Sequence, residues 1–309
     1  MPGIHNRYVI VICILFVSLT FTVFAGNAQA ENSPKGFAFD NSENYTAYPG
    51  LHGGNGVVRY TEGFGADDFK SRYHFVRTGI IPPKSGIGEY RAMDAEEVFI
   101  IMSGSVFVTL NGNTALINNG NMIPCRIGEM IGLYNPTNED VSFAWIAVTE
   151  KKGVYNPVDS GNDLSGKKQG LPCPFTSISF MGGDYDNPIK SAHGGKGPIY
   201  DTLGYIVHAH FTGKWSASPM ILPPGTSIGY HRHDNHEEIF FVVTGSARAT
   251  VDDVTLDQGP GDCTICPLGS AHGIYNNGPE DLHIIVSSLS AVPSGRRDAV
   301  DLGDDLTGR

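Results

Sequence analysis

The chain has 309 residues, of which 39 are glycine and 19 proline, with 17% charged residues and a formal net charge of −11. This composition is typical of a turn-rich globular protein and excludes a largely disordered one. The acidic balance, with no basic stretch, excludes a phosphate-backbone partner, so we expect no nucleic acid to bind. An anionic substrate would need a metal ion or a local arginine.

The first thirty residues are predicted to be a signal peptide. A short start precedes the apolar run Tyr8–Phe24, and the triplet Ala28-Gln29-Ala30 places a cleavage site after Ala30. A retained membrane anchor is the alternative, because an apolar run of 17 residues lies at the lower edge of what can span a bilayer. We therefore expect a secreted or periplasmic protein that has no membrane contact after cleavage.

Residues 31–72 show no clean period and are predicted to form an N-terminal arm that packs on the first domain. From Tyr73 onward the pattern is one of short strands separated by glycine-rich turns. The pair Asn111-Gly112 between Val106–Leu110 and Thr114–Ile117 is a strong hairpin signal. No segment has a convincing helical period, so an all-β sandwich or barrel is predicted.

An internal repeat defines the organisation of the chain. A shift of 141 residues aligns Ile87–Leu110 with Ile228–Val251 and Cys125–Val141 with Cys266–Leu282, without a gap. The chain is therefore predicted to be a duplication of a small β-unit.

The repeat sets the predicted domain bounds. The first unit covers residues 73–150 and the second covers residues 205–291. Residues 151–204, rich in Gly, Lys, Asp and Pro, are predicted to be a connector, and residues 292–309 a polar tail that frays.

Two histidines and a glutamate in the second unit suggest a metal site. On a strand, His231 and His233 point to one face while Arg232 points to the other. Glu238 begins the predicted return strand and can face both imidazoles across a hairpin. Two neutral imidazoles and a carboxylate suit a divalent transition metal. A surface hairpin with scattered histidines is the alternative.

The second repeat resembles the cupin superfamily in both of its sequence motifs. The motif G-x5-H-x-H-x4-E-x6-G begins at Gly225, and the motif G-x5-P-x-G-x2-H-x3-N begins at Gly261. The resemblance implies two tandem double-stranded β-helix barrels of jelly-roll topology. It also implies one metal ion inside the second barrel, held by His231, His233, Glu238 and His272.

The chemistry of these four ligands agrees with that expectation. Burying the carboxylate unpaired would cost several kcal/mol, and a metal ion removes this cost. Three nitrogens and one oxygen leave about two octahedral positions open, which suits Mn or Fe(II), with Ni, Co, Cu and Zn as lesser options. Metal chemistry at open positions is typical of an enzyme.

Two neighbouring patterns compete with this assignment. His236 and Glu237 precede Glu238, but the step of seven residues from Glu238 to the next glycine recurs from Glu97 in the first repeat. The pair His208-Ala209-His210 lacks a glutamate at the right distance. Its histidines are expected at the core edge or surface, and a role as acid or base in the pocket is the alternative.

The first repeat lacks three of the four ligands. Tyr90, Ala92 and Ile131 stand where the second repeat has its histidines, and Glu97 alone is retained. We therefore expect a first barrel without metal that serves as a structural partner. The alternative is that Tyr90 and Glu97 line a second organic pocket.

The resemblance limits the function to a few classes. Two-barrel cupins include decarboxylases, dioxygenases, aminohydrolases and storage proteins. We expect a metal-dependent oxidoreductase, dioxygenase or decarboxylase that acts on a small carboxylic acid, phenol or sugar derivative. A binding or sensing module without turnover is the alternative, and the metal could also only stabilise the barrel.

The alternation of side chains also predicts the pocket around the metal. The residues expected to point inward are Phe240, Val242, Ile274 and Asn276, each of which could instead be ordinary barrel core. The expected partner is a small molecule, and the sequence leaves a homo-oligomer open.

Overall fold

The computed structural model describes residues 34–170, 177–181, 188–201, 214–292 and 298–309. The predicted signal peptide and the His208-Ala209-His210 pattern lie outside these residues. Besides strands, the described part contains three short 3-10 turns, η1 (Ser42–Asn44), η2 (Leu51–Gly53) and η3 (Ala66–Asp68). Within the described part, no helix is long and apolar enough to cross a membrane.

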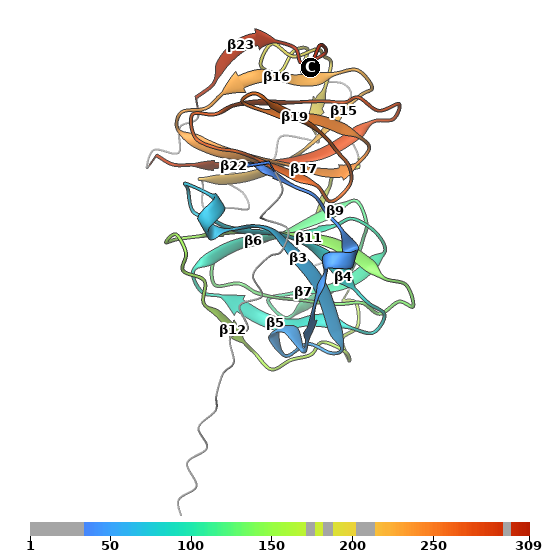
Figure 1. Ribbon diagram of the computed structural model, residues 1–309. Helices are drawn as coiled ribbons and strands as arrows, with labels where there is room; N and C mark the ends of the chain where they lie inside the picture. The colour runs from blue at the N-terminus through green and yellow to red at the C-terminus, as the bar shows by residue number, and fades with distance from the viewer. Residues whose placement is uncertain (1–33, 171–176, 182–187, 202–213, 293–297) are drawn as a thin grey trace, which may run out of the picture. The chain divides into compact units, whose positions relative to one another are not determined.

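The first barrel consists of two antiparallel sheets (Figure 1). The seven-stranded sheet has the order β13-β9-β6-β11-β4-β3-β2, and the five-stranded sheet the order β12-β5-β10-β7-β8. The strands are β2 (Thr46–Pro49), β3 (Val57–Gly65), β4 (Tyr73–Ile81), β5 (Gly86–Ala92), β6 (Ala95–Ile101), β7 (Ser105–Leu110), β8 (Asn113–Asn118), β9 (Asn121–Cys125), β10 (Met130–Tyr134), β11 (Val141–Thr149), β12 (Pro157–Asp159) and β13 (Ile178–Ser179).

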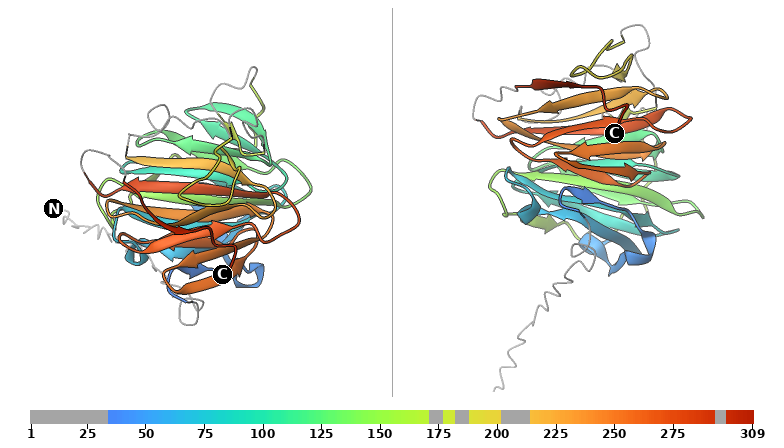
Figure 2. Two further views of the ribbon diagram at one scale, coloured as in Figure 1. Left: turned by 90° about the horizontal axis from the view of Figure 1, so that it is seen from above. Right: turned by 45° about the horizontal axis from the view of Figure 1, so that its top comes forward.

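The second barrel repeats this arrangement with a six-stranded sheet, β1-β20-β17-β22-β15-β14, and a five-stranded sheet, β19-β18-β21-β16-β23. Figure 2 shows its strands from two further sides. The strands are β1 (Phe37–Ala38), β14 (Tyr200–Asp201), β15 (Trp215–Leu222), β16 (Ser227–Arg232), β17 (His236–Thr244), β18 (Ala247–Val251), β19 (Val254–Gln258), β20 (Cys263–Cys266), β21 (Ala271–Tyr275), β22 (Leu282–Ser290) and β23 (Val300–Asp304). The predicted all-β fold of two tandem jelly-roll barrels is confirmed.

Strand alternation divides the apolar side chains among three cores. On β11, Phe143, Trp145 and Ala147 fill the first barrel, while Ala144 and Ile146 belong to a second cluster with residues of both barrels. This middle cluster also contains side chains of β6, β15, β17 and β22, so the large sheets of the two barrels pack on each other. These strands are buried on both faces, which explains their near-continuous apolar sequences.

The predicted hairpin around the metal motif is wrong in its pairing. Strand β16 pairs with β21 and β23, whereas β17 pairs with β20 and β22 in the other sheet. The segment between β16 and β17 is thus a corner at which the chain changes sheets. The histidines and Glu238 face each other across the barrel interior and not along a two-stranded ladder.

Three segments outside the predicted units also join the barrel sheets. Within the arm, β2 and β3 extend the large sheet of the first barrel, whereas β1 pairs with β20 of the second. Within the predicted connector, β12 pairs with β5 and β14 with β15. Val300–Asp304 of the predicted tail is not frayed, because it forms β23 on the edge of β16.

Candidate metal centre

The four predicted ligands come from three places in the second barrel. His231 lies on β16 directly opposite His272 on β21, and His233 follows the end of β16. Glu238 lies on β17 in the opposing sheet. All four side chains are buried, and one ligand atom from each lies within 4.8 Å of the others. The structure therefore brings the predicted set together.

The distances within the cluster match the span of one ion. Glu238 Oε2 lies 3.4 Å from His233 Nε2, 3.5 Å from His272 Nε2 and 3.9 Å from His231 Nε2. The Nε2 atoms of His231 and His233 are 2.9 Å apart. A metal bound at about 2.1 Å holds neighbouring ligand atoms roughly 3 to 3.5 Å apart, so the four atoms need to move little to share one ion.

Backbone carbonyls fix the tautomer of all three imidazoles. Nδ1 of His231 donates to the Gly229 carbonyl at 2.8 Å, and Nδ1 of His272 donates to the Ser270 carbonyl at 3.1 Å. Nδ1 of His233 donates to the Asp298 carbonyl. Because a carbonyl only accepts, each proton sits on Nδ1 and each Nε2 presents a lone pair to the cluster.

In this arrangement the Nε2 lone pairs of the imidazoles have no hydrogen-bond donor. The Nε2 atoms of His231 and His233 face each other, and in this tautomer neither can donate to the other. His272 Nε2 is buried and has no hydrogen-bond partner. Buried polar atoms without partners are rare and costly. A divalent transition metal satisfies all three nitrogens and the carboxylate at once, so the residues fit the ion that the motif implies.

The electrostatics of Glu238 agree with this fit. Burial raises the pKa of Glu238, but the surrounding imidazoles of His231, His233, His236 and His272 together hold that pKa well below its usual value. Burial lowers the pKa of His231, which favours the neutral imidazole that a metal requires. The carboxylate is thus charged and His231 neutral, as in a metal-ligand set. Burial lowers the pKa of His233 as well, but the contact with Glu238 outweighs this and raises that pKa above its usual value.

Glu237 and His236 have roles that the sequence did not assign. Glu237 points away from the imidazoles and accepts hydrogen bonds from the backbone amides of Lys70, at 2.9 Å, and Ser71, at 2.6 Å. His236 is buried, with its Nε2 3.5 Å from Glu238 Oε1. The spacing of two along β17 places His236 and Glu238 on one face, a signal that the sequence contained.

A second histidine next to the cluster was also missed. The ring of His193 stacks on that of His231 with centroids 3.9 Å apart and planes 13° from parallel. Its Nδ1 contacts Asp301 Oδ1 at 3.0 Å, and Asp301 is the β23 partner of His231. A histidine and an aspartate from the predicted connector and tail thus hold one face of a candidate ligand.

The first barrel has an equivalent arrangement, a histidine that stacks on a barrel residue and contacts an aspartate of the edge strand. We call this arrangement the clamp, and in the first barrel it lies beside Tyr90 and Glu97. His52 stacks on Tyr90 at 4.0 Å and contacts Asp159 at 2.7 Å, and Asp159 pairs with Tyr90 on β12. Tyr90 donates to Glu97 Oε2, while Tyr155 donates to Oε1 at 2.6 Å. Two hydroxyls therefore satisfy the retained carboxylate. Among the described residues, no set of three metal-ligating groups forms in this barrel.

The predicted pocket residues lie in or beside the barrel core. Phe240, Val242 and Ile274 are fully buried in the core cluster of the second barrel, and the Phe240 ring lies 5.7 Å from that of His272. Asn276 donates to the carbonyls of Leu222 and Glu280 and accepts from a loop amide. Its amide group therefore fixes the loop, and we do not assign it a polar contact to a ligand.

Known proteins resemble this chain in both sequence and fold. Residues 219–288 match the family model described as cupin domain. An oxalate-binding protein of Thermotoga maritima is 28% identical over 97 residues, which cover 31% of this chain and 80% of that protein. A deletion mutant of Bacillus subtilis oxalate decarboxylase has a TM-score of 0.58 at 14% identity, covering 87% of this chain and 80% of the other. Tomato (Solanum lycopersicum) vicilin has a TM-score of 0.60 at 14% identity, covering 87% and 88%.

The family match thus covers the second barrel, and the fold of the whole chain is that of two tandem jelly-roll barrels, as in the two solved structures. Residues 219–288 match the cupin domain, and the complete metal motif lies in the C-terminal barrel alone. The two solved structures share the fold, and one is a decarboxylase while the other is a vicilin. The fold by itself therefore assigns no activity.

Proposed function

We propose that this protein is an exported, metal-dependent enzyme that acts on a small carboxylic acid in its second barrel. The observation that carries the proposal is the cluster of three Nε2 lone pairs and one carboxylate, including the partnerless Nε2 of His272. Four protein ligands leave about two positions open to a bidentate substrate on Mn or Fe(II). Export rests on the predicted signal peptide.

The substrate class is supported by chemistry and by a relative. The open positions favour a molecule with two oxygen donors, and the net charge of −11 gives no other general attraction for an anion. The relative from Thermotoga maritima is named an oxalate-binding protein, and its match covers 80% of its length. We therefore place small dicarboxylates ahead of phenols and sugar derivatives.

The residues of this chain supply positioning and an acid–base group. The Nδ1 hydrogen bonds of His231, His233 and His272 orient their rings, and Ser288 donates to Glu238 Oε1. When bound, the metal would act as a Lewis acid or as the centre for dioxygen. His236, with its Nε2 3.5 Å from Glu238 Oε1, lies next to the ligand set and would serve as the acid–base group.

Turnover measurements on metal-loaded protein test this proposal. Carbon dioxide release and oxygen consumption would be followed with a panel of dicarboxylates, other organic acids and phenols. We expect turnover of a dicarboxylate that disappears in His272→Ala and persists in His74→Ala, which changes a first-barrel histidine. Retained turnover in metal-free His272→Ala would contradict the proposal.

A second candidate is a binding module without turnover, favoured by the name of the same relative. In that case the loaded protein would show a ligand-dependent rise in melting temperature but no product with any member of the panel. This result would replace the enzyme by the binder while leaving the metal assignment in place.

A further inference from the structure

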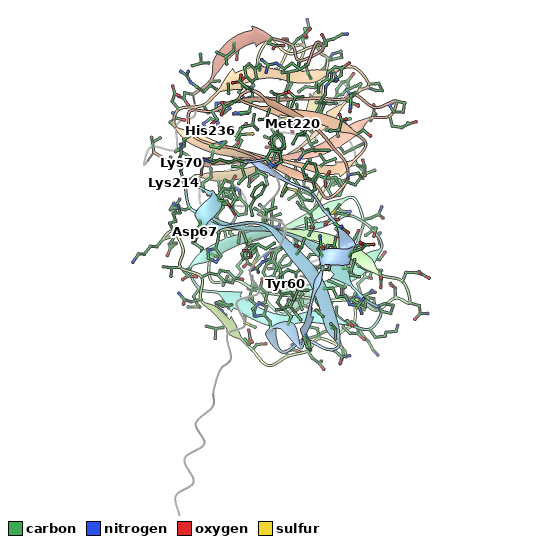
Figure 3. The ribbon with its side chains drawn as sticks, viewed as in Figure 1. Tyr60, Asp67, Lys70, Lys214, Met220 and His236 are labelled. Atoms are coloured by element: carbon green, nitrogen blue, oxygen red, sulfur yellow. The ribbon has the colours of Figure 1, made fainter. Side chains whose placement is uncertain are left out.

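A cationic hollow lies on the second barrel's boundary with the first, apart from the metal centre. It has a volume of about 230 Å³ and is lined by Lys70, Ser71, Arg72, Lys152, Lys214 and Ser290–Val292. Lys70 and Lys214 come from segments 144 residues apart in the sequence and meet at this edge (Figure 3). Four positive side chains thus gather in a chain whose formal net charge is −11.

None of these four cations pairs with a carboxylate of the described residues. Lys70 Nζ donates to the Leu268 carbonyl at 3.2 Å, and Lys152 Nζ donates to the Phe69 carbonyl. Arg72 donates through one nitrogen to the carbonyls of Thr149 and Glu150, at 3.1 and 3.2 Å. Carbonyls orient these groups without neutralising them.

The Lys214 side chain makes no hydrogen bond or ion pair within the described part of the chain. Four like charges around one hollow repel each other, so the arrangement costs free energy unless an anion offsets it. The buried carboxylate of Glu237 is already bonded to the amides of Lys70 and Ser71. It therefore fixes the position of the Lys70–Arg72 segment and supplies no counter-ion to the ammonium groups.

Ser71 provides an independent sign of a ligand. Its side chain is 7% exposed and its Oγ has no hydrogen-bond partner, although the residue lines the hollow. A buried hydroxyl without a partner is uncommon in folded proteins. An oxygen-rich anion in the hollow would accept the hydrogen bond that the Ser71 hydroxyl lacks.

We propose that Lys70, Ser71, Arg72, Lys152 and Lys214 form a binding site for a small dianion with several acceptor oxygens. Arginine and lysine beside a hydroxyl are the groups that bind phosphate, sulfate and dicarboxylates. Glu96 and Glu150 line the adjoining hollow of about 190 Å³, which shares Arg72 and Lys214. The negative charges of these two carboxylates would repel an anion from the adjoining hollow, so we place the anion in the hollow that the lysines line.

Titration calorimetry at constant ionic strength with two probes, sulfate and succinate, tests the site. Wild-type protein should bind one equivalent of at least one probe. Tighter binding of sulfate would assign a tetrahedral oxyanion, and tighter binding of succinate a dicarboxylate. Lys214→Gln should weaken binding about tenfold, the value of one charge-assisted hydrogen bond. Lys214→Glu should abolish it.

The controls separate this site from general electrostatics and from the metal. Lys151→Gln removes the same charge from the neighbouring surface and should change the dissociation constant less than about twofold. His272→Ala, which would remove any succinate bound at the metal centre, should leave binding in the cationic hollow unchanged. Because the Lys214 side chain makes no hydrogen bond or ion pair in the described structure, Lys214→Gln should also retain the wild-type melting temperature.

Three results would overturn the proposal. The first is no saturable binding of either probe below about 10 mM. The second is an equal loss in Lys151→Gln and Lys214→Gln. The third is binding that survives in Lys214→Gln but is lost in His272→Ala, which would place the anion at the metal centre.

Discussion

The retained carboxyl of the first barrel gives a quantitative prediction about stability and pH. Glu97 is fully buried, and burial raises its pKa from 4.5 to about 7, an effect that the hydrogen bonds from Tyr155 and Tyr90 oppose only in part. Below pH 4.5 the carboxyl is protonated in both the folded and the unfolded chain. As the pH rises towards 7, the unfolded chain loses the proton first, so folding becomes less favourable.

The size of this effect follows from the difference between the two pKa values. Each pKa unit corresponds to about 1.4 kcal/mol, so Glu97 should cost roughly 3 kcal/mol of folding free energy above pH 7 relative to pH 4. Glu97→Gln keeps the size of the side chain and cannot ionise. The variant should therefore equal wild type near pH 4 and exceed it by roughly 3 kcal/mol near pH 8.

Guanidinium unfolding curves of both proteins, from about pH 4 to about pH 8, measure this difference. Subtracting the unfolding free energy of the variant from that of wild type cancels the contributions of the other titrating groups, because these are common to both proteins. Glu43→Gln, which removes an exposed carboxyl, controls for the change in net charge. A difference that stays flat between pH 4 and pH 8, or a variant less stable than wild type at the upper end, would refute the reasoning.

Three further predictions concern the metal. Elemental analysis should find about one metal per chain in wild type and in His74→Ala and almost none in His272→Ala, because three ligands remain around a disrupted site. Metal content should also fall as the pH drops below about 6.5, where imidazoles take up protons, and content that stays flat to about pH 4 would contradict a three-histidine site. His193→Ala should weaken metal binding about tenfold by freeing one face of His231, whereas His52→Ala should leave it unchanged in chelator competition.

The sequence predicted the candidate metal centre better than the strand pairing around it. The motif spacing fixes which residues lie at a corner, and His231, His233, Glu238 and His272 meet as the motif implies. Alternation along a strand, however, does not identify its neighbours. The pattern around Glu238 fits a hairpin as well as a change of sheets, and only the contacts across the barrel separate the two.

The stacking histidines and their aspartates also follow the internal repeat of the sequence. The His-Gly-Gly triplet at His52 recurs at His193 with the same shift of 141 residues, and the Val-Asp pair at Asp159 recurs at Asp301 one residue later. Both lie in segments interpreted as arm, connector or tail, where composition hid the repeat. The cationic hollow had no such signal, because Lys70 and Lys214 meet only after the barrels pack.

The two clamps show which part of the duplicated unit depends on metal. His52 stacks on Tyr90 in the first barrel as His193 stacks on His231 in the second, and each contacts an aspartate on the paired edge strand. The clamp is therefore present with a metal-ligand set and without one. Its general role is to hold the edge strand, β12 or β23, against the barrel. In the second barrel the same contact also orients the candidate ligand His231. Loss of His193 should therefore weaken metal binding, whereas loss of His52 should affect the stability of the first barrel alone.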